Sequence, residues 1–192
     1  MIAFPNCKIN LGLNIINKRS DGYHNLETVF LPIDLKDILE LIRIDSSDDP
    51  SKKNNSINFF SSGIAVTDNP ADNICLKAYQ LLQNDFSQLN AAVRIHLHKI
   101  IPAGAGLGGG SADGAFMLQL LNKKFNLGLS TEQLLAYTLQ LGSDCPFFIY
   151  NKPCFASGRG EKLETIGLDL SAYKILIVNP GIHISTANAF SN

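Results

Sequence analysis

The chain has 192 residues, of which 45% are hydrophobic, and its formal net charge at pH 7 is −1. This length and composition suit one large folded domain, or one and a half, and exclude a disordered chain. A net charge near zero gives no electrostatic case for binding nucleic acid or a membrane surface. The four cysteines form neither a C-x-x-C pair nor a zinc-site spacing, so we expect reduced thiols in a cytoplasmic protein. The start of the chain lacks a signal-peptide pattern, and no apolar run approaches the length of a membrane span.

Alternating hydrophobic residues predict the first strand, over residues 2–16. Lys8 and Asn10 share one face of this strand, because successive side chains point to opposite faces. A lysine on a strand most often lies on a solvated face. Two polar side chains on one face could also belong to a site, and the pattern alone leaves both interpretations open.

A turn follows the first strand. The dipeptide Asp21-Gly22 is a hairpin signal, and it predicts that a second strand over residues 25–34 pairs antiparallel with the first. Tyr23 and His24 leave this turn. They are either ordinary strand residues, or an aromatic face that could stack on a base and an imidazole that could hydrogen-bond to it.

The middle of the chain predicts three strands and a helix. The strands lie over residues 37–45, 57–60 and 92–99, and the helix over 73–86 has Asp72 as its N-cap. His96 and His98 share one face of the third strand and could hold a metal ion. No third ligand is evident, so a solvated strand face is the preferred interpretation.

A glycine-rich run separates the strand over 92–99 from a helix that should begin at Ser111. Five of the seven residues from Gly104 to Gly110 are glycine. The backbone N–H groups of such a loop can turn toward one point, and the helix N-terminus adds unpaired N–H groups and partial positive charge. The run therefore suits a phosphate group. A flexible linker fits less well, because linkers alternate glycine with serine or threonine.

Two common phosphate-binding motifs do not account for this loop. A P-loop needs a lysine before its serine or threonine, whereas Ser111 follows Gly110 directly. The glycine spacing also matches the dinucleotide-binding pattern. That fold requires a strand ending in an acidic residue after the helix, whereas residues 126–133 read as a helix stop and a new helix start.

The last third of the chain predicts several short elements. A capping box formed by Ser130 and Gln133 should open a helix that ends near Leu141. A short helix is expected over 143–150, where the isolated sequence favours Asp144 as an N-cap. The remaining elements are a hairpin over 155–159 and 162–166 and a buried apolar strand over 174–178.

The glycine-rich run resembles the P-x-x-x-G-L-G-G-G-S motif of the GHMP small-molecule kinases. The resemblance extends to Lys8-Ile-Asn-Leu, Arg19-Ser-Asp-Gly-Tyr-His24, Gly142-Ser-Asp-Cys-Pro-Phe147 and Asn179-Pro-Gly181. The R-x-D-G-Y-H element makes the chain similar to the 4-diphosphocytidyl-2-C-methyl-D-erythritol kinases of non-mevalonate isoprenoid synthesis. The resemblance implies ATP-dependent phosphorylation of the 2-hydroxyl of 4-(cytidine 5′-diphospho)-2-C-methyl-D-erythritol, with Mg²⁺ bridging phosphate oxygens.

The fold implied by the resemblance is the α+β, two-lobe GHMP kinase fold. Its first lobe is of the ribosomal-protein-S5-domain-2-like type and contains a left-handed β-α-β unit, an exception to the usual crossover rule. We expect residues 1–167 to form the ATP-binding lobe. Residues 168–192 would begin a second lobe that is largely missing from this chain.

The resemblance also implies roles for individual residues. Lys8 and Asp144 match the catalytic pair, in which Asp144 would accept the hydroxyl proton and Lys8 would keep it ionised. Tyr23 and Phe190 would sandwich the cytosine. The implied ATP-binding residues are Lys99, Pro102, Ala103, Gly104, Ala105, Gly106, Leu107, Gly108, Gly109, Gly110, Ser111 and Ala112, with Ser111 as a candidate magnesium ligand. The implied substrate-binding residues are Asn10, Tyr23, His24, Thr186 and Phe190.

Two alternatives remain open at this point. One is another GHMP kinase, acting on homoserine, mevalonate or galactose, which the element from Arg19 to His24 disfavours. The other is a nucleotide-binding protein without turnover. The expected partner in the preferred interpretation is a small molecule that contains a cytidine diphosphate group.

Overall fold

The computed structural model describes residues 1–44, 56–65 and 72–181. These residues form two four-stranded sheets. The first has the order β1 (Ile2–Ala3), β4 (Ile38–Ile44), β6 (Ala92–Lys99), β5 (Ile57–Gly63), and the second has the order β2 (Asn6–Lys18), β3 (His24–Lys36), β7 (Cys154–Ser157), β8 (Lys162–Thr165). The helices are α1 (Ile74–Gln83), the 3₁₀ turn η2 (Ser87–Leu89), α2 (Gly109–Lys124), α3 (Thr131–Leu141) and α4 (Phe147–Tyr150).

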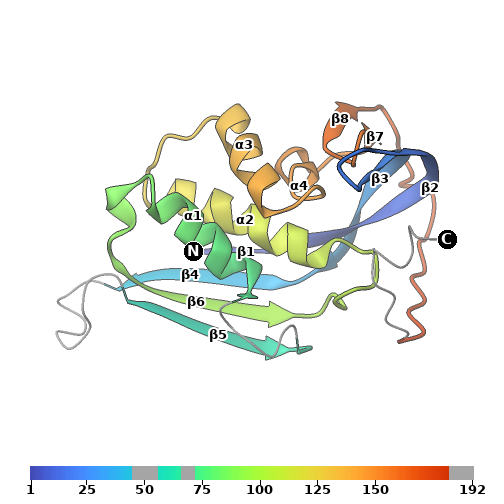
Figure 1. Cartoon of the computed structure of the whole chain (residues 1–192). Coiled ribbons are helices and arrows are strands. Elements are labelled where there is room, and N and C mark those ends of the chain that lie inside the picture. The colour runs from blue at the N-terminus through green and yellow to red at the C-terminus, as the bar shows by residue number, and fades with distance from the viewer. Residues whose placement is uncertain (45–55, 66–71, 182–192) are drawn as a thin grey trace.

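The helices α1 and α2 cover one face of the first sheet, with α3 packed beside them (Figure 1). Alternation along β6 explains which face they cover. Val93, Ile95 and Leu97 are fully buried against the helices, while Arg94 points the other way. β5 and β6 pair in parallel and are joined through α1, so they form a β-α-β unit.

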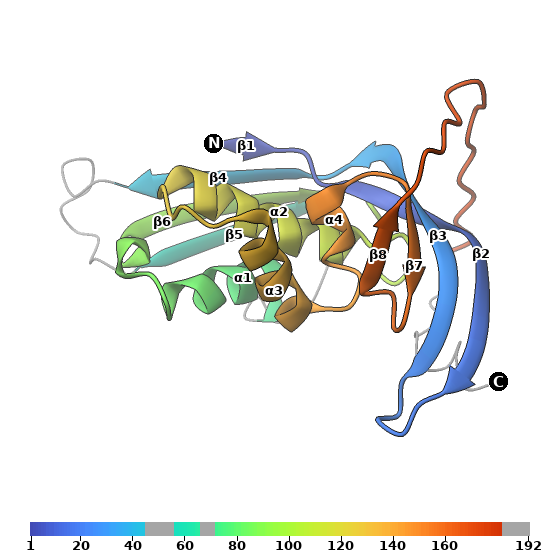
Figure 2. The ribbon, with the colours of Figure 1, turned by 90° about the horizontal axis from the view of Figure 1, so that it is seen from above.

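The second sheet is built on a long hairpin of β2 and β3. The two strands pair antiparallel, which confirms the prediction for residues 25–34. The hairpin projects beyond the helical layer, and β7 and β8 lie beside its inner part (Figure 2). The predicted hairpin around Gly160 is therefore also confirmed.

The expected first strand is two strands that belong to different sheets. β1 pairs with β4, whereas β2 pairs with β3. Pro5 lies between them, and proline has no backbone N–H to continue a strand ladder. The expected N-cap Asp72 is also wrong by one residue, because the side chain of Asn73 accepts the hydrogen bond from the N–H of Cys75 at 2.9 Å.

The helices around the glycine-rich run follow the sequence closely. α2 begins at Gly109, two residues before the expected start. The capping box of α3 is confirmed, because Ser130 and Gln133 bond to each other's backbone N–H groups at 2.9 and 3.3 Å. α4 is shorter than expected, since residues 143–146 form a turn and the helix begins at Phe147.

The prediction of a buried strand over 174–178 is wrong. These residues are not in a strand, and Leu176 and Val178 are 86% and 78% exposed. An apolar run becomes a buried strand only where another strand pairs with it and a further layer covers it. In the described part of the chain no strand pairs with this segment, and only Ile177 packs against a core cluster, that of Cys7, Ile101 and Leu107.

Among the described residues, no helix combines the length and the apolar character needed to cross a membrane.

Candidate active site

A cavity of about 1320 Å³ lies where the β2–β3 hairpin, the glycine-rich run and the turn before α4 meet. The β7–β8 turn and part of the segment after β8 complete its lining. Most of the expected site residues line this one cavity: Lys8, Asn10, Tyr23, His24, Pro102, Ala103, Gly104, Ala105, Gly106, Leu107, Gly108, Gly109, Gly110, Ser111 and Asp144.

The fold brings Lys8 and Asp144 together from distant parts of the sequence. Lys8 is on β2 and Asp144 is in the turn between α3 and α4. The ammonium nitrogen lies 3.3 Å from Asp144 Oδ2, and the two side chains are 6% and 35% exposed. The carboxylate thus remains accessible from the cavity while its cationic partner is buried.

The ammonium of Lys8 is held by more than the ion pair. It donates a hydrogen bond to Asn10 Oδ1 at 2.7 Å and lies 4.8 Å from the ring centroid of Phe30. Asn10 donates in turn to Thr28 Oγ1 at 3.0 Å, and that hydroxyl donates to the carbonyl of Gly12 at 2.6 Å. This chain of contacts across β2 and β3 restricts where the charge can point.

The glycine-rich run passes directly over Lys8. Gly104, Gly106 and Gly108 have φ of +69°, +73° and +68°, a backbone region that disfavours other residues. A Cβ at Gly108 would lie 3.1 Å from both Cε and Cγ of Lys8. Leu107 is buried and packs in a hydrophobic cluster with Cys7 and Ile101. The close approach therefore requires glycine at position 108.

The first turn of α2 faces the same cavity. Gly109, Gly110 and Ser111 line it. The N–H groups of a first helical turn have no partners within the helix and carry partial positive charge. With Lys8 nearby, this end of the cavity suits the anionic oxygens of a phosphate chain.

The other part of the cavity contains an aromatic ring and a cation. Tyr23 is 53% exposed, and the guanidinium of Arg159 lies 4.5 Å from its ring centroid. His24 also lines this part. The sequence prediction missed Arg159, although the glycines on either side of it, both with positive φ, signal a tight turn that presents its side chain.

Two of the expected ATP-binding residues do not line the cavity. Ala112 is fully buried beneath it. Lys99 is 3% exposed, and its ammonium contacts Asp37 and Asp113 rather than the cavity. Burial raises the pKa of Asp113 to about 7, although the charge of Lys99 acts in the opposite direction.

Thr186 and Phe190 lie outside the described residues, so their substrate-binding roles stay predictions.

The described residues contain no cluster of three or more histidine, cysteine or acidic side chains that could hold a metal ion. Asp144 is the one carboxylate among the described residues that line the cavity, and Ser111 supplies a hydroxyl. This donor set fits a Mg²⁺ ion held largely by phosphate oxygens better than a resident metal.

The histidine pair on β6 lies elsewhere. His96 Nε2 and His98 Nδ1 each lie 2.9 Å from Ser62 Oγ, on the sheet face away from the helices.

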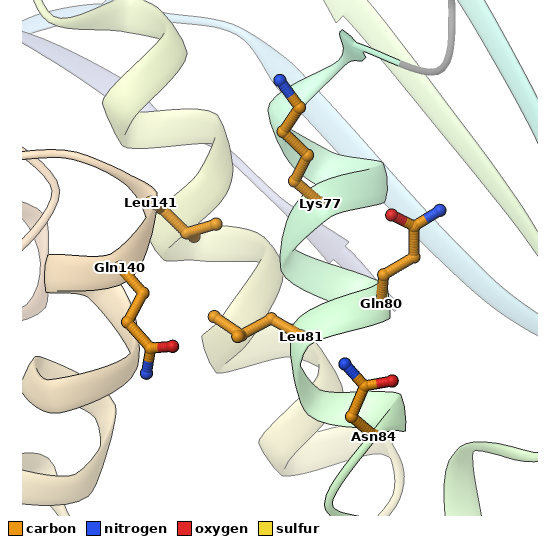
Figure 3. A pocket seen from close by; sticks show the side chains of 6 residues that line it. All are labelled: Lys77, Gln80, Leu81, Asn84, Gln140 and Leu141. Carbon is orange, nitrogen blue, oxygen red and sulfur yellow. The ribbon is translucent and has the colours of Figure 1, made fainter.

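A second hollow, of about 460 Å³, lies between α1 and α3 (Figure 3). Its six lining side chains include one titratable group, Lys77. The Lys8–Asp144 pair and the glycine-rich run both line the larger cavity.

A family model described as the GHMP kinases N terminal domain matches residues 73–152. A 4-diphosphocytidyl-2-C-methyl-D-erythritol kinase of Azobacteroides pseudotrichonymphae genomovar. CFP2 is 52% identical over 192 residues, covering 100% of this chain and 67% of the relative. The chain belongs to the 4-diphosphocytidyl-2-C-methyl-D-erythritol kinase family. A family member from Bacteroides thetaiotaomicron is also 52% identical, with the same coverage.

Solved structures agree with this family. A crystal structure of 4-(cytidine 5′-diphospho)-2C-methyl-D-erythritol kinase superposes with a TM-score of 0.72 at 32% identity, covering 88% of this chain and 56% of the other. A mevalonate kinase superposes with a TM-score of 0.62 at 14% identity, which shows the shared fold alone. The expected α+β GHMP kinase fold is confirmed. The chain spans about two thirds of the length of its curated relatives and 56% of the chain in the crystal structure.

Proposed function

We propose that the protein is an ATP-dependent kinase that phosphorylates the 2-hydroxyl of 4-(cytidine 5′-diphospho)-2-C-methyl-D-erythritol. The observation that carries the proposal is the Lys8–Asp144 pair, 3.3 Å apart and beside a glycine-rich phosphate loop in one cavity. A base, a cation and an anion-binding loop are parts that recur in enzymes of phosphoryl transfer.

The phosphate chain of ATP fits the end of the cavity formed by the glycine-rich run and the start of α2. Positive φ at Gly104, Gly106 and Gly108 leaves the loop without Cβ atoms at the points where it bends. Phosphoryl transfer leaves little covalent chemistry for a protein to perform, so positioning and charge stabilisation are the main contributions expected of this loop. Mg²⁺ would neutralise the transferring group, held by phosphate oxygens and the hydroxyl of Ser111.

Asp144 is the proposed general base. Its carboxylate would accept the proton of the attacking hydroxyl as the new bond from oxygen to the γ-phosphorus forms and the bond to the β–γ bridging oxygen breaks. The adjacent ammonium of Lys8 would stabilise charge on the phosphoryl oxygens. Asn10 would hold that ammonium in place, because it accepts its hydrogen bond at 2.7 Å.

The aromatic part of the cavity is the proposed site for the cytidine group. The exposed ring of Tyr23 can stack on a pyrimidine, and Arg159 packs against the same ring, 4.5 Å from its centroid. Lys18, His24 and Arg159 also give this part a basic character, which suits a substrate with a diphosphate. The names of the relatives support the same substrate class.

An acceptor panel tests the proposal. ATP consumption by this chain should require the cytidylyl substrate, and homoserine, mevalonate or galactose should give no more turnover than buffer. Turnover with another acceptor would point to another GHMP kinase activity. Binding of ATP without turnover on any acceptor would favour a nucleotide-binding protein and contradict the proposal for this chain.

A further inference from the structure

Three charged side chains form a buried cluster beneath the glycine-rich run. Lys99 is the last residue of β6, Asp37 lies between β3 and β4, and Asp113 is in α2. The ammonium of Lys99 lies 2.5 Å from Asp37 Oδ2 and 2.8 Å from Asp113 Oδ2. Their side chains are at most 2% exposed.

Such a cluster is poorly explained by stability alone. Burying two charges costs hydration free energy, and the attraction between the charges often does not compensate for that cost. Apolar replacements of a buried ion pair can therefore be neutral or stabilising. Here two carboxylates share one cation, and Asp113 Oδ1 is buried without a hydrogen-bond partner. The arrangement therefore suggests a role in specifying a geometry.

The geometry that it specifies is that of the loop ends. Asp37 Oδ1 accepts the backbone N–H groups of Ile100 at 2.6 Å and Ile101 at 2.9 Å, where the chain leaves β6 for the loop. Asp113 lies where the chain has just entered α2 after the loop. The ammonium of Lys99 contacts both carboxyl groups, so one side chain connects the residues at the start of the loop with those at its end.

Close packing at the helix start strengthens this connection. A Cβ at Gly109 would lie 2.7 Å from Ile101 Cγ2 and 3.3 Å from the ammonium of Lys99. The start of α2 therefore packs directly against Ile101, whose backbone N–H donates to Asp37. A change in the separation of Lys99 and Asp113 must move the loop.

We propose that Lys99, Asp37 and Asp113 are positioning residues that hold the two ends of the phosphate-binding loop at a fixed separation. Lys99 then serves ATP binding through the loop and not by contact with the nucleotide. This inference rests on the proposed function for its ligand, ATP, but its structural part concerns the loop alone.

The variant Asp113→Ala tests the inference. It leaves Lys99 paired with Asp37, so the remaining pair is neutral, and it releases the helix end of the loop. Misplacement of binding groups by about 1 Å can cost about 100-fold, so we expect ATP affinity by calorimetry to fall about 10–100-fold. Affinity for cytidine 5′-diphosphate, bound at the other end of the cavity, should change less than about twofold, since that end does not depend on the loop.

Hydrogen exchange supplies a readout that needs no nucleotide. The N–H of Lys8 donates to Leu107 at 2.9 Å and that of Ala112 donates to Gly108 at 2.9 Å, so both amides report on the loop. We expect these amide hydrogens to exchange about tenfold faster in Asp113→Ala, because a hydrogen-bonded amide exchanges when the structure around it opens locally. Asp113→Asn keeps an oxygen acceptor for Lys99 and should restore most of the protection and the affinity.

The matched control is Tyr79→Phe, which removes a buried hydrogen bond to the carbonyl of Leu89 at 2.6 Å, away from the loop. It should lower the melting temperature without changing loop exchange or ATP affinity.

Unchanged loop exchange in Asp113→Ala, or an equal effect in Tyr79→Phe, would overturn the inference. If Asp113→Ala does not fold, Asp113→Ser, which removes the carboxyl group but keeps a polar atom at this buried position, is judged by the same criteria. A wild-type chain that does not bind ATP would contradict the proposed function, while loop exchange would still decide the inference.

Discussion

The backbone N–H of Lys8 donates a hydrogen bond to the carbonyl of Leu107 at 2.9 Å. The strand that carries the cationic partner of Asp144 is therefore attached directly to the glycine-rich run. A displacement of the loop and a displacement of the Lys8–Asp144 pair are consequently linked. This connection explains how a phosphate chain and an acceptor hydroxyl could be aligned by one element.

Replacing the proposed base tests its chemical role. Asp144→Asn keeps the size of the side chain but removes the proton acceptor, so we expect a fold that still binds ATP and a kcat reduced by about 10²–10⁴-fold. Steady-state kinetics with the cytidylyl substrate measure the loss. The exposed Glu164 on β8 provides the control, because Glu164→Gln should leave kcat unchanged. Retention of most of the turnover by Asp144→Asn would exclude Asp144 as the base.

Two glycines in the same loop separate backbone strain from steric contact. Gly108→Ala and Gly106→Ala both place an alanine at positive φ, which costs about 1–2 kcal/mol of unfolding free energy. A Cβ at position 108 would press on Lys8, whereas one at position 106 meets open space. We therefore expect Gly108→Ala to lose more stability in urea unfolding than Gly106→Ala. It should also lower ATP affinity more. Equal effects on both measurements would contradict the close approach of the loop to Lys8.

Removal of the aromatic ring tests the cytidine site. Stacking of a base on an aromatic side chain contributes about 1–3 kcal/mol, so Tyr23→Ala should raise the KM for the cytidylyl substrate about 5–150-fold. The KM for ATP should stay within about twofold, since Tyr23 lies away from the phosphate end. Tyr173→Ala is the control, because this ring is 71% exposed and does not line the cavity. A rise in the KM for ATP alone would place the nucleotide, rather than the acceptor, beside Tyr23.

The buried Asp113 predicts a pH dependence of stability. Burial raises its pKa from the ordinary value of 3.8 to about 7 in the folded chain, so the folded state binds more protons than the unfolded state between these values. The contribution of Asp113 to unfolding free energy therefore falls as pH rises from about 4 to about 7. Asp113→Asn resembles the protonated form, so its stability relative to the wild type should increase over this interval in urea unfolding. A constant difference would show that Asp113 does not change its protonation there.

Local sequence signals predicted much of the fold. Alternation located β6, the turn at Asp21-Gly22 predicted the β2–β3 pairing, and the capping box located the start of α3. Each of these features depends on neighbours within a few residues. The break at Pro5 and the exposed segment over 174–178 were missed, because both depend on which strand is available as a partner.

The site could be predicted only in part for the same reason. The glycine-rich run indicated a phosphate site by composition, whereas Lys8 and Asp144 looked like a surface lysine and a helix cap until a family resemblance connected them. Nothing in the spacing of Asp37 and Lys99 indicates that they meet. Such contacts are created by the packing of sheets and helices and have no local signal.

Phosphorus NMR of the reaction product tests the central proposal most directly. This chain, ATP, Mg²⁺ and 4-(cytidine 5′-diphospho)-2-C-methyl-D-erythritol should give a new phosphate monoester on the 2-oxygen, with one ADP formed for each product molecule. Omission of the cytidylyl substrate should abolish ADP formation. ADP formation without the monoester, or a monoester on another oxygen, would contradict the account.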